Sequence, residues 1–223
     1  MIYLCKYRIE KEIESMTRSQ IIRDIAQDNI TIESALQRLL VISYTLNNLE
    51  LQHWIESELN GYTADSILPD YRKKVTYMIR YTGFNANTLV KRQPLPESYF
   101  GDELQEILKS RVIKDGVNII EDTIKNESEV SFNLIDCAGI ISNNSDGMIR
   151  CVSLEQIISK TTFLQIISNV KTKLILILLD LEKEFGSLDN LDIDVTVKSN
   201  EELKEVNNKL TNKLYFNGKS EIL

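Results

Sequence analysis

The segment that most limits how this chain can fold is a long apolar stretch near its C-terminus, residues 161–185. Its apolar side chains recur seven positions apart in interleaved series, which predicts one long helix with a broad apolar face. These series are Ile167, Leu174 and Leu181; Val170 and Ile177; and Leu178 and Phe185. The longest uninterrupted apolar run, residues 174–179, has six residues, whereas a helix needs about 20 to cross a bilayer. We therefore expect a buried core helix and not a membrane anchor.

Shorter helices are expected before residue 61. Residues 32–46 carry apolar side chains at the helical period behind a capping Thr31, and weaker patterns predict helices over 1–16 and 19–28. Asn47 and Glu50 have the spacing of a capping box, which opens a further helix. The apolar stripe of that helix is Leu51, Trp54, Ile55 and Leu59. His53 and Glu56 face away from the stripe, and Gly61 is placed to end the helix in the left-handed conformation.

Beyond Pro69 the apolar period changes from helical to alternating. The alternation predicts short strands over residues 75–82, 89–91, 129–135 and 147–152. A helix broken near Asp115-Gly116 is expected over 102–126, and a polar turn over 142–147. Ser153 and Gln156 have capping-box spacing, which predicts that a helix begins there.

The last part of the chain, residues 187–223, is expected to form a small β–α–β-like appendage. Its sequence combines an alternating stretch (Leu191, Ile193, Val195, Val197), a helix capped by Asn200 with an apolar stripe (Leu203, Val206, Leu210, Leu214), and an Asn217-Gly218 turn. So small a piece cannot bury these faces alone. We expect it to pack on the rest of the chain or to mediate self-association or the docking of a protein partner. The fold class is α+β and helix-dominated: an N-terminal helical subdomain, small antiparallel strands in the middle, the long core helix and this appendage.

Charge and cysteine content exclude several classes of protein. A formal net charge of −7 and a pI near 5.0 argue against broad binding to nucleic acid or to an anionic membrane. Cys5, Cys137 and Cys151 form no CxxC pair, which fits a reducing compartment. No apolar secretory segment follows the N-terminus. We therefore expect a cytoplasmic protein.

Neither a cofactor nor a metal is expected. His53 is the only histidine, so zinc sites with several histidines and most nucleophile–histidine arrangements lack their residues. The eight glycines form no phosphate-binding loop. A nuclease with an unfamiliar carboxylate site is an alternative: Asp70 after Pro69 would need a Glu-x-Lys partner such as Glu202-Leu203-Lys204. Catalytic residues are not identified by the sequence.

A group of residues between Trp54 and Arg72 admits two interpretations. In the structural one, Trp54 fills the core, Gly61 turns the chain, Pro69 fixes the next turn, and Glu58 is a candidate partner of Arg72. In the functional one, Tyr62, Tyr71 and Arg72 form a binding surface, because Tyr and Arg are frequent in interface hot spots. The structural interpretation is favoured for Trp54, Glu58, Gly61 and Pro69.

The same residues carry a resemblance to a known family. The pattern W-I-x-x-E-L-x-G-Y at 54–62, followed by L-P-x-Y-R at 68–72, resembles the N-terminal signature of the AbiTii family of bacterial abortive-infection proteins. The ending LDLEKEFG of the long helix is similar to the family's C-terminal helix. The resemblance implies three parts: an extension (1–18), an AbiTii-like domain (19–186) and a C-terminal segment (187–223).

The resemblance also implies a function, namely antiviral defence in which an infected cell arrests before phage can spread. No catalytic motif accompanies the signature, so two classes of activity stay open. The first is a non-enzymatic component that binds or senses a phage or host macromolecule, with a protein partner or self-association expected. The second is an effector enzyme such as a nuclease.

Overall fold

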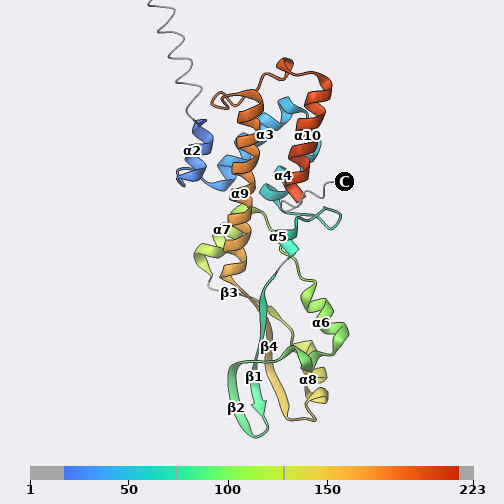
Figure 1. Ribbon diagram of the computed structural model, residues 1–223. Coiled ribbons are helices and arrows are strands. Elements are labelled where there is room, and N and C mark those ends of the chain that lie inside the picture. The colour runs from blue at the N-terminus through green and yellow to red at the C-terminus, as the bar shows by residue number, and fades with distance from the viewer. Residues whose placement is uncertain (1–17, 74, 128, 216–223) are drawn as a thin grey trace, which may run out of the picture. The chain divides into compact units, whose positions relative to one another are not determined.

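The computed structural model describes residues 18–73, 75–127 and 129–215, and its elements are mostly helices with one antiparallel sheet (Figure 1). The helix-dominated α+β class predicted from the sequence is thereby confirmed. The chain divides into two units. The helical unit draws on residues 1–70, 115–119 and 167–223, and the sheet unit on residues 71–114 and 120–166. The helix predicted over residues 1–16 lies outside the described residues.

The helical unit begins with α2 (Gln20–Ala26), α3 (Ile32–Leu46) and α4 (Leu49–Asn60). Thr31 caps α3 as predicted, since its Oγ1 accepts a hydrogen bond from the Ser34 amide at 3.1 Å. The cap of α4 is Asn48 rather than the predicted Asn47: Asn48 Oδ1 accepts from the Leu51 amide at 2.9 Å. Asn47 instead ends α3 with a left-handed φ of 52°, a conformation that Asn tolerates better than most residues.

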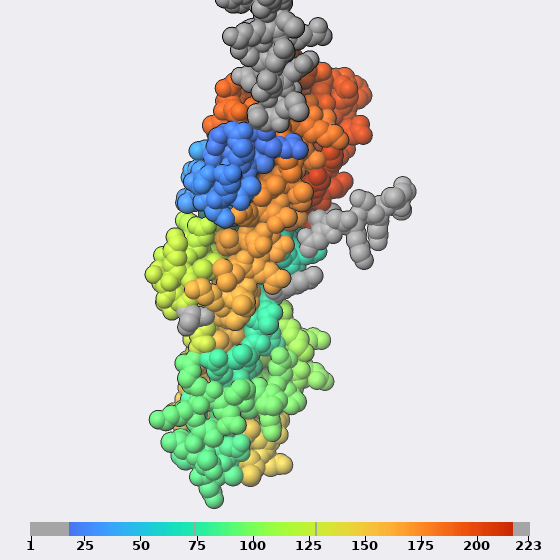
Figure 2. Space-filling model, turned by 60° about the vertical axis from the view of Figure 1, so that its left-hand side comes forward, coloured from blue at the N-terminus to red at the C-terminus, as the bar shows by residue number. Residues whose placement is uncertain are grey.

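The core of the helical unit is built on α9 (Lys160–Phe185). Five of its apolar side chains are fully buried: Val170, Leu174, Ile177, Leu178 and Leu181. Of the described helices, α9 is the one whose length and composition would suffice to cross a membrane, but these side chains face the protein interior. Its opposite face reaches the surface, in orange in Figure 2, and carries the exposed Leu176. The predicted long core helix is therefore confirmed.

Helix α10 (Asn200–Tyr215) packs within the same unit. Of its predicted stripe, Val206, Leu210 and Leu214 are buried, and Leu203 is partly exposed. Ion pairs join it to α9, because Asp180 contacts both Lys209, at 3.2 Å, and Lys213. The stripe is therefore used inside the chain, and it no longer supports self-association through this helix.

The strand predicted over residues 191–197 is wrong. Leu191 has a left-handed φ of 55°, and the Asp194 carboxylate accepts a hydrogen bond from the Thr196 amide at 2.9 Å. This local side-chain bond competes with strand pairing and shapes a short 3-10 helix, η3 (Val195–Val197). The second strand of the expected β–α–β piece would follow Tyr215 and lies outside the described residues.

The sheet unit contains four antiparallel strands in the order β2-β1-β4-β3. They are β1 (Tyr77–Asn85), β2 (Thr88–Pro94), β3 (Glu129–Asn133) and β4 (Ile149–Ser159). The inner face of the sheet buries Ile79, Tyr81 and Leu154 in one cluster with Phe100, Leu108 and Ile141. Those last three residues come from the helices η1 (Glu97–Phe100), α6 (Asp102–Lys109) and α8 (Ala138–Asn144). The remaining short elements are α5 (Asp70–Lys73), α7 (Val117–Asn126) and η2 (Ile135–Cys137).

Strand β4 corrects two predictions. The helix expected to begin at Ser153 is absent, because β4 continues to Ser159. The polar turn expected over 142–147 is shorter than predicted: α8 includes residues 142–144, and the turn occupies residues 145–147. Strand β4 pairs with both β1 and β3, and Gln156 is fully buried within it. Its Nε2 donates to the Leu108 carbonyl at 3.1 Å, and its Oε1 accepts from Arg111 Nε at 2.6 Å. A polar residue satisfied in this way can occupy a buried strand.

Gly83 supplies a test of the β1–β4 pairing. A Cβ at this position would collide with the Arg150 carbonyl oxygen on β4. We expect Gly83→Ala to lower the free energy of unfolding by about 1–3 kcal/mol, measured by urea denaturation. The matched control is Gly139→Ala in α8, where nothing lies within 4 Å of the added Cβ. For Gly139→Ala we expect a gain in the free energy of unfolding of about 0.5–1 kcal/mol. Equal losses in the two variants would contradict the close approach of β1 to β4 at Gly83.

Candidate functional site

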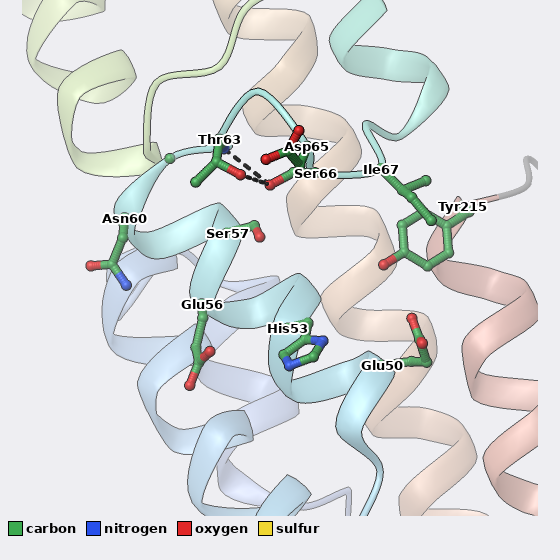
Figure 3. Close-up of a pocket in the computed structure, with 11 residues that line it drawn as sticks. Glu50, His53, Glu56, Ser57, Asn60, Thr63, Asp65, Ser66, Ile67 and Tyr215 are labelled. Atoms are coloured by element: carbon green, nitrogen blue, oxygen red, sulfur yellow. Dashed lines mark hydrogen bonds between the residues drawn. The ribbon is translucent and has the colours of Figure 1, made fainter.

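A polar cavity of about 490 Å³ opens on the helical unit. Helix α4 forms one wall, residues 61–67 after that helix form the rim, and Tyr215 at the end of α10 closes one side (Figure 3). All residues that line it belong to the helical unit. The geometry of this site is therefore set within one unit of the chain.

The period of α4 explains why polar side chains gather on this wall. Glu50, His53 and Glu56 follow at intervals of three, which places them on one side of a helix. The other side buries Leu51, Trp54, Ile55 and Glu58. His53 and Glu56 thus face away from the apolar stripe, as predicted.

The cavity is anionic. Its lining contains three carboxylates, Glu50, Glu56 and Asp65, and no lysine or arginine among the residues that the structure describes. Burial and the nearby charge of Glu50 raise the pKa of Tyr215 above its ordinary value, so this hydroxyl stays protonated at neutral pH. Tyr215 and Asp65 come from parts of the chain in which no residue pattern indicates a site.

The rim has its own hydrogen bonds. The Thr63 amide donates to Ser66 Oγ at 3.0 Å, and the two hydroxyl groups lie 2.8 Å apart (Figure 3). These bonds hold residues 63–66 in a tight turn beside α4. The cavity therefore combines carboxylates with hydroxyl groups, a chemistry that suits a positively charged group able to donate several hydrogen bonds.

Among residues 18–73, 75–127 and 129–215, no three His, Cys, Asp or Glu side chains are grouped as a metal site would require. The expected absence of metals and cofactors stays a prediction. Glu202, the proposed partner of Asp70 in a nuclease site, accepts hydrogen bonds from the Ser199 amide at 2.8 Å and from its hydroxyl at 2.9 Å. Glu202 thus caps α10, which is a structural use of the side chain.

The thiols of Cys137 and Cys151 belong to the sheet unit. Burial raises the pKa of both, and the charge of Asp136 adds to the effect at Cys137. A raised pKa reduces the fraction of reactive thiolate. Neither cysteine contributes to the cavity.

The signature residues of α4 are buried on its other side. Trp54 is 1% exposed and Glu58 is fully buried. Tyr62, 7% exposed, donates its hydroxyl to Glu58 Oε1 at 2.5 Å. Gly61 ends the helix with φ 95°, and Pro69 is buried. These positions support the structural interpretation of Trp54, Glu58, Gly61 and Pro69.

Tyr71 and Arg72 begin the sheet unit and are also buried, at 7% and 0% exposure. Arg72 Nη1 donates to the Ile113 carbonyl at 3.4 Å, and the Arg72 carbonyl accepts from the Ile113 amide at 3.1 Å. The binding role of Tyr62, Tyr71 and Arg72 stays a prediction, but their burial leaves them little side-chain surface for a partner.

Comparison with known proteins places these features in a family. The model of the AbiTii family matches residues 18–206, which extends beyond the predicted 19–186 into α10. Neither a curated protein nor a solved structure matches the chain.

Proposed function

The chain belongs to the AbiTii family, and from this membership, which implies abortive-infection defence against phage, we propose that it acts as a non-enzymatic binding component of that defence. The site is the cavity on α4, and the partner is a phage or host macromolecule met in the cytoplasm. A protein partner fits best, since the chain carries a net charge of −7 and nucleic acid would be repelled.

The observation that carries this proposal is the set of carboxylates around an open cavity. Glu50, Glu56 and Asp65 line it, and none of the other lining residues within the described part of the chain is basic. A lysine or arginine side chain of the partner would supply the missing charge and would donate to several oxygens at once. Hydrogen bonds to charged groups contribute about 1.5–3 kcal/mol each, which is enough for one such group to decide whether the partner binds.

The same cavity also favours a second candidate, an effector enzyme. His53 lies on the wall between Glu50 and Glu56 (Figure 3), and a histidine beside carboxylates can act as a general acid or base. The two candidates assign different importance to His53. It would be indispensable in an enzyme, whereas in the binding component the carboxylates carry the interaction.

Plaque assays with cavity variants test the proposal. We expect the double variant Glu56→Gln, Asp65→Asn to lose most protection across a phage panel, because its affinity for a cationic group falls about 10- to 100-fold. His53→Gln should keep protection. The matched control is Glu205→Gln, an exposed glutamate of α10 outside the cavity.

The outcomes separate the two candidates when the folding of each variant is confirmed by thermal melting. Protection that survives the double variant would contradict the binding site. The enzyme would be favoured if His53→Gln alone abolished protection and the purified wild-type protein had nuclease activity.

A further inference from the structure

The outer face of the sheet carries an exposed apolar patch at the β1–β2 end. The strand register places Phe84 opposite Leu89 on one side and opposite Arg150 on the other. Val152 lies two residues beyond Arg150 on β4, next to the register shift at Thr82/Gly83. We call Phe84, Leu89, Arg150 and Val152 the hairpin patch.

The side chains of this patch face solvent. Exposure is 37% for Phe84, 56% for Leu89 and 67% for Val152, and Arg150 is exposed as well. Cys151, between Arg150 and Val152, packs against the inner cluster, so its two neighbours point outward. Figure 2 shows the surface of β1 and β2 in green.

Arg150 is the available cation of the patch. Its guanidinium lies 5.2 Å from the centre of the Phe84 ring, a cation–π arrangement. Among the described residues it forms no ion pair, and its Nη2 donates only to the Ala86 carbonyl, at 3.4 Å. Arg80 and Arg92 differ, because both are paired with Glu129.

Charge and composition indicate the class of partner. Residues 71–114 and 120–166 contain 12 Lys and Arg against 11 Asp and Glu, whereas the rest of the chain contains 14 against 22. The sheet unit thus lacks the strong negative charge of the helical unit. Arginine and aromatic side chains are enriched at protein interfaces, so Arg150 beside the exposed Phe84 favours a protein partner.

Nucleic acid fits this face less well. Glu129 pairs with Arg80 and Arg92, and Glu155 lies opposite Arg80 in the register. A phosphate backbone that followed the sheet would pass two carboxylates and find two of the arginines already neutralised. A single aromatic ring also gives little stacking surface for bases.

We propose that the hairpin patch docks a protein segment that presents a carboxylate beside apolar side chains. The carboxylate pairs with Arg150, and the apolar groups cover Phe84, Leu89 and Val152. The inference rests on the proposed role as a binding component, but not on the cavity of α4. The hairpin patch is then a second contact surface. It prefers an anionic group, whereas the cavity of α4 prefers a cationic one.

The test uses the full chain with labelled methyl groups, observed by NMR. The probe is a short synthetic peptide in which Asp alternates with Leu and Phe, and the matched peptide has Lys in place of Asp. We expect the Asp peptide to shift the methyl signals of Leu89 and Val152 and the Lys peptide to leave them unchanged. Arg150→Glu should weaken binding of the Asp peptide about tenfold and create binding of the Lys peptide. The control Lys125→Glu, at an exposed position of α7, should behave as wild type.

Three results would overturn the proposal. One is the absence of shifts with the Asp peptide, and another is an equal response to the two peptides. The third is a shift of the same signals by oligothymidylate or by raising the protein concentration alone, which would assign the patch to nucleic acid or to a second copy. Because the readout is binding to a defined peptide, failure of the plaque assay would refute the defence role without producing any of these results.

Discussion

Trp54→Ala is expected to lower the free energy of unfolding by about 3–5 kcal/mol. Trp54 is 1% exposed and belongs to the stripe on which Leu51 and Ile55 are fully buried. Truncation removes a large apolar surface and leaves a void that a packed core cannot fill. For a chain of this size the loss corresponds to a fall in melting temperature of roughly 6–20 °C, which circular dichroism would measure.

Two variants make this prediction specific. Trp54→Phe should retain most of the stability, because the ring still fills much of the space. Tyr44→Ala removes an aromatic side chain that is 63% exposed and should change the stability by no more than about 0.5 kcal/mol. An unchanged melting temperature for Trp54→Ala combined with lost protection would show that Trp54 contacts a partner instead of the core.

Glu58→Ala should also cost about 3–5 kcal/mol, since it removes one member of a buried charged network. Glu58 is fully buried and accepts a hydrogen bond from the Tyr62 hydroxyl at 2.5 Å. Burial lowers the pKa of Lys173, and the charges of Asp70 and Glu58 counteract that effect. Without Glu58 the hydroxyl loses its acceptor, and the buried ammonium loses part of its compensation. Urea denaturation would measure the loss.

Two further variants separate the effect of the charge of Glu58 from the effect of its shape. Glu58→Gln keeps the size and an acceptor for Tyr62 while removing the charge. Tyr62→Phe removes one donor and should cost about 1–3 kcal/mol. If Glu58→Ala were as stable as wild type, the buried carboxylate would have no structural role, and the interpretation of the signature residues as elements of the fold would fail.

Helices with a strong period and a clear cap could be predicted closely. The predicted bounds of α3, residues 32–46, coincide with the observed ones, and α9 begins one residue earlier than predicted. In both helices the residues that are apolar in the sequence are also the residues that are buried, because each helix presents one apolar side to the core. Local and tertiary preferences then agree.

The failures occur where tertiary contacts override the local pattern. Leu154, Ile157 and Ile158 are spaced as on a helix, yet β4 is buried at all three positions and at Gln156. The strand forms where β4 pairs with both β1 and β3, which are far away in sequence, and the contacts of Gln156 with Leu108 and Arg111 satisfy its buried amide. Over residues 191–197 the apolar residues alternate as in a strand, which predicts a strand. Hydrogen bonds between side chains and the backbone form a short turn there instead.

The candidate cavity was predictable in part. The period of α4 correctly placed His53 and Glu56 on the polar side of the helix. That Asp65 and Tyr215 join them depends on the turn at 63–66 and on the position where α10 ends. Neither follows from the spacing of residues, because the contributing segments are about 150 residues apart in the chain.

The path of the chain has a consequence for synthesis on the ribosome. The helical unit takes residues from both ends, so α2, α3 and α4 are made first while the part of α9 that completes their core begins only at residue 167. At bacterial rates the intervening residues take roughly 5–20 s to synthesise. During this interval the apolar stripes around Leu36 and Trp54 lack their partners on α9, and by its end all four strands of the sheet have been synthesised. The sheet unit is thus the first that nascent chains can complete, and a premature stop after residue 166 would release a chain in which α2, α3 and α4 lack the α9 side chains that complete their core.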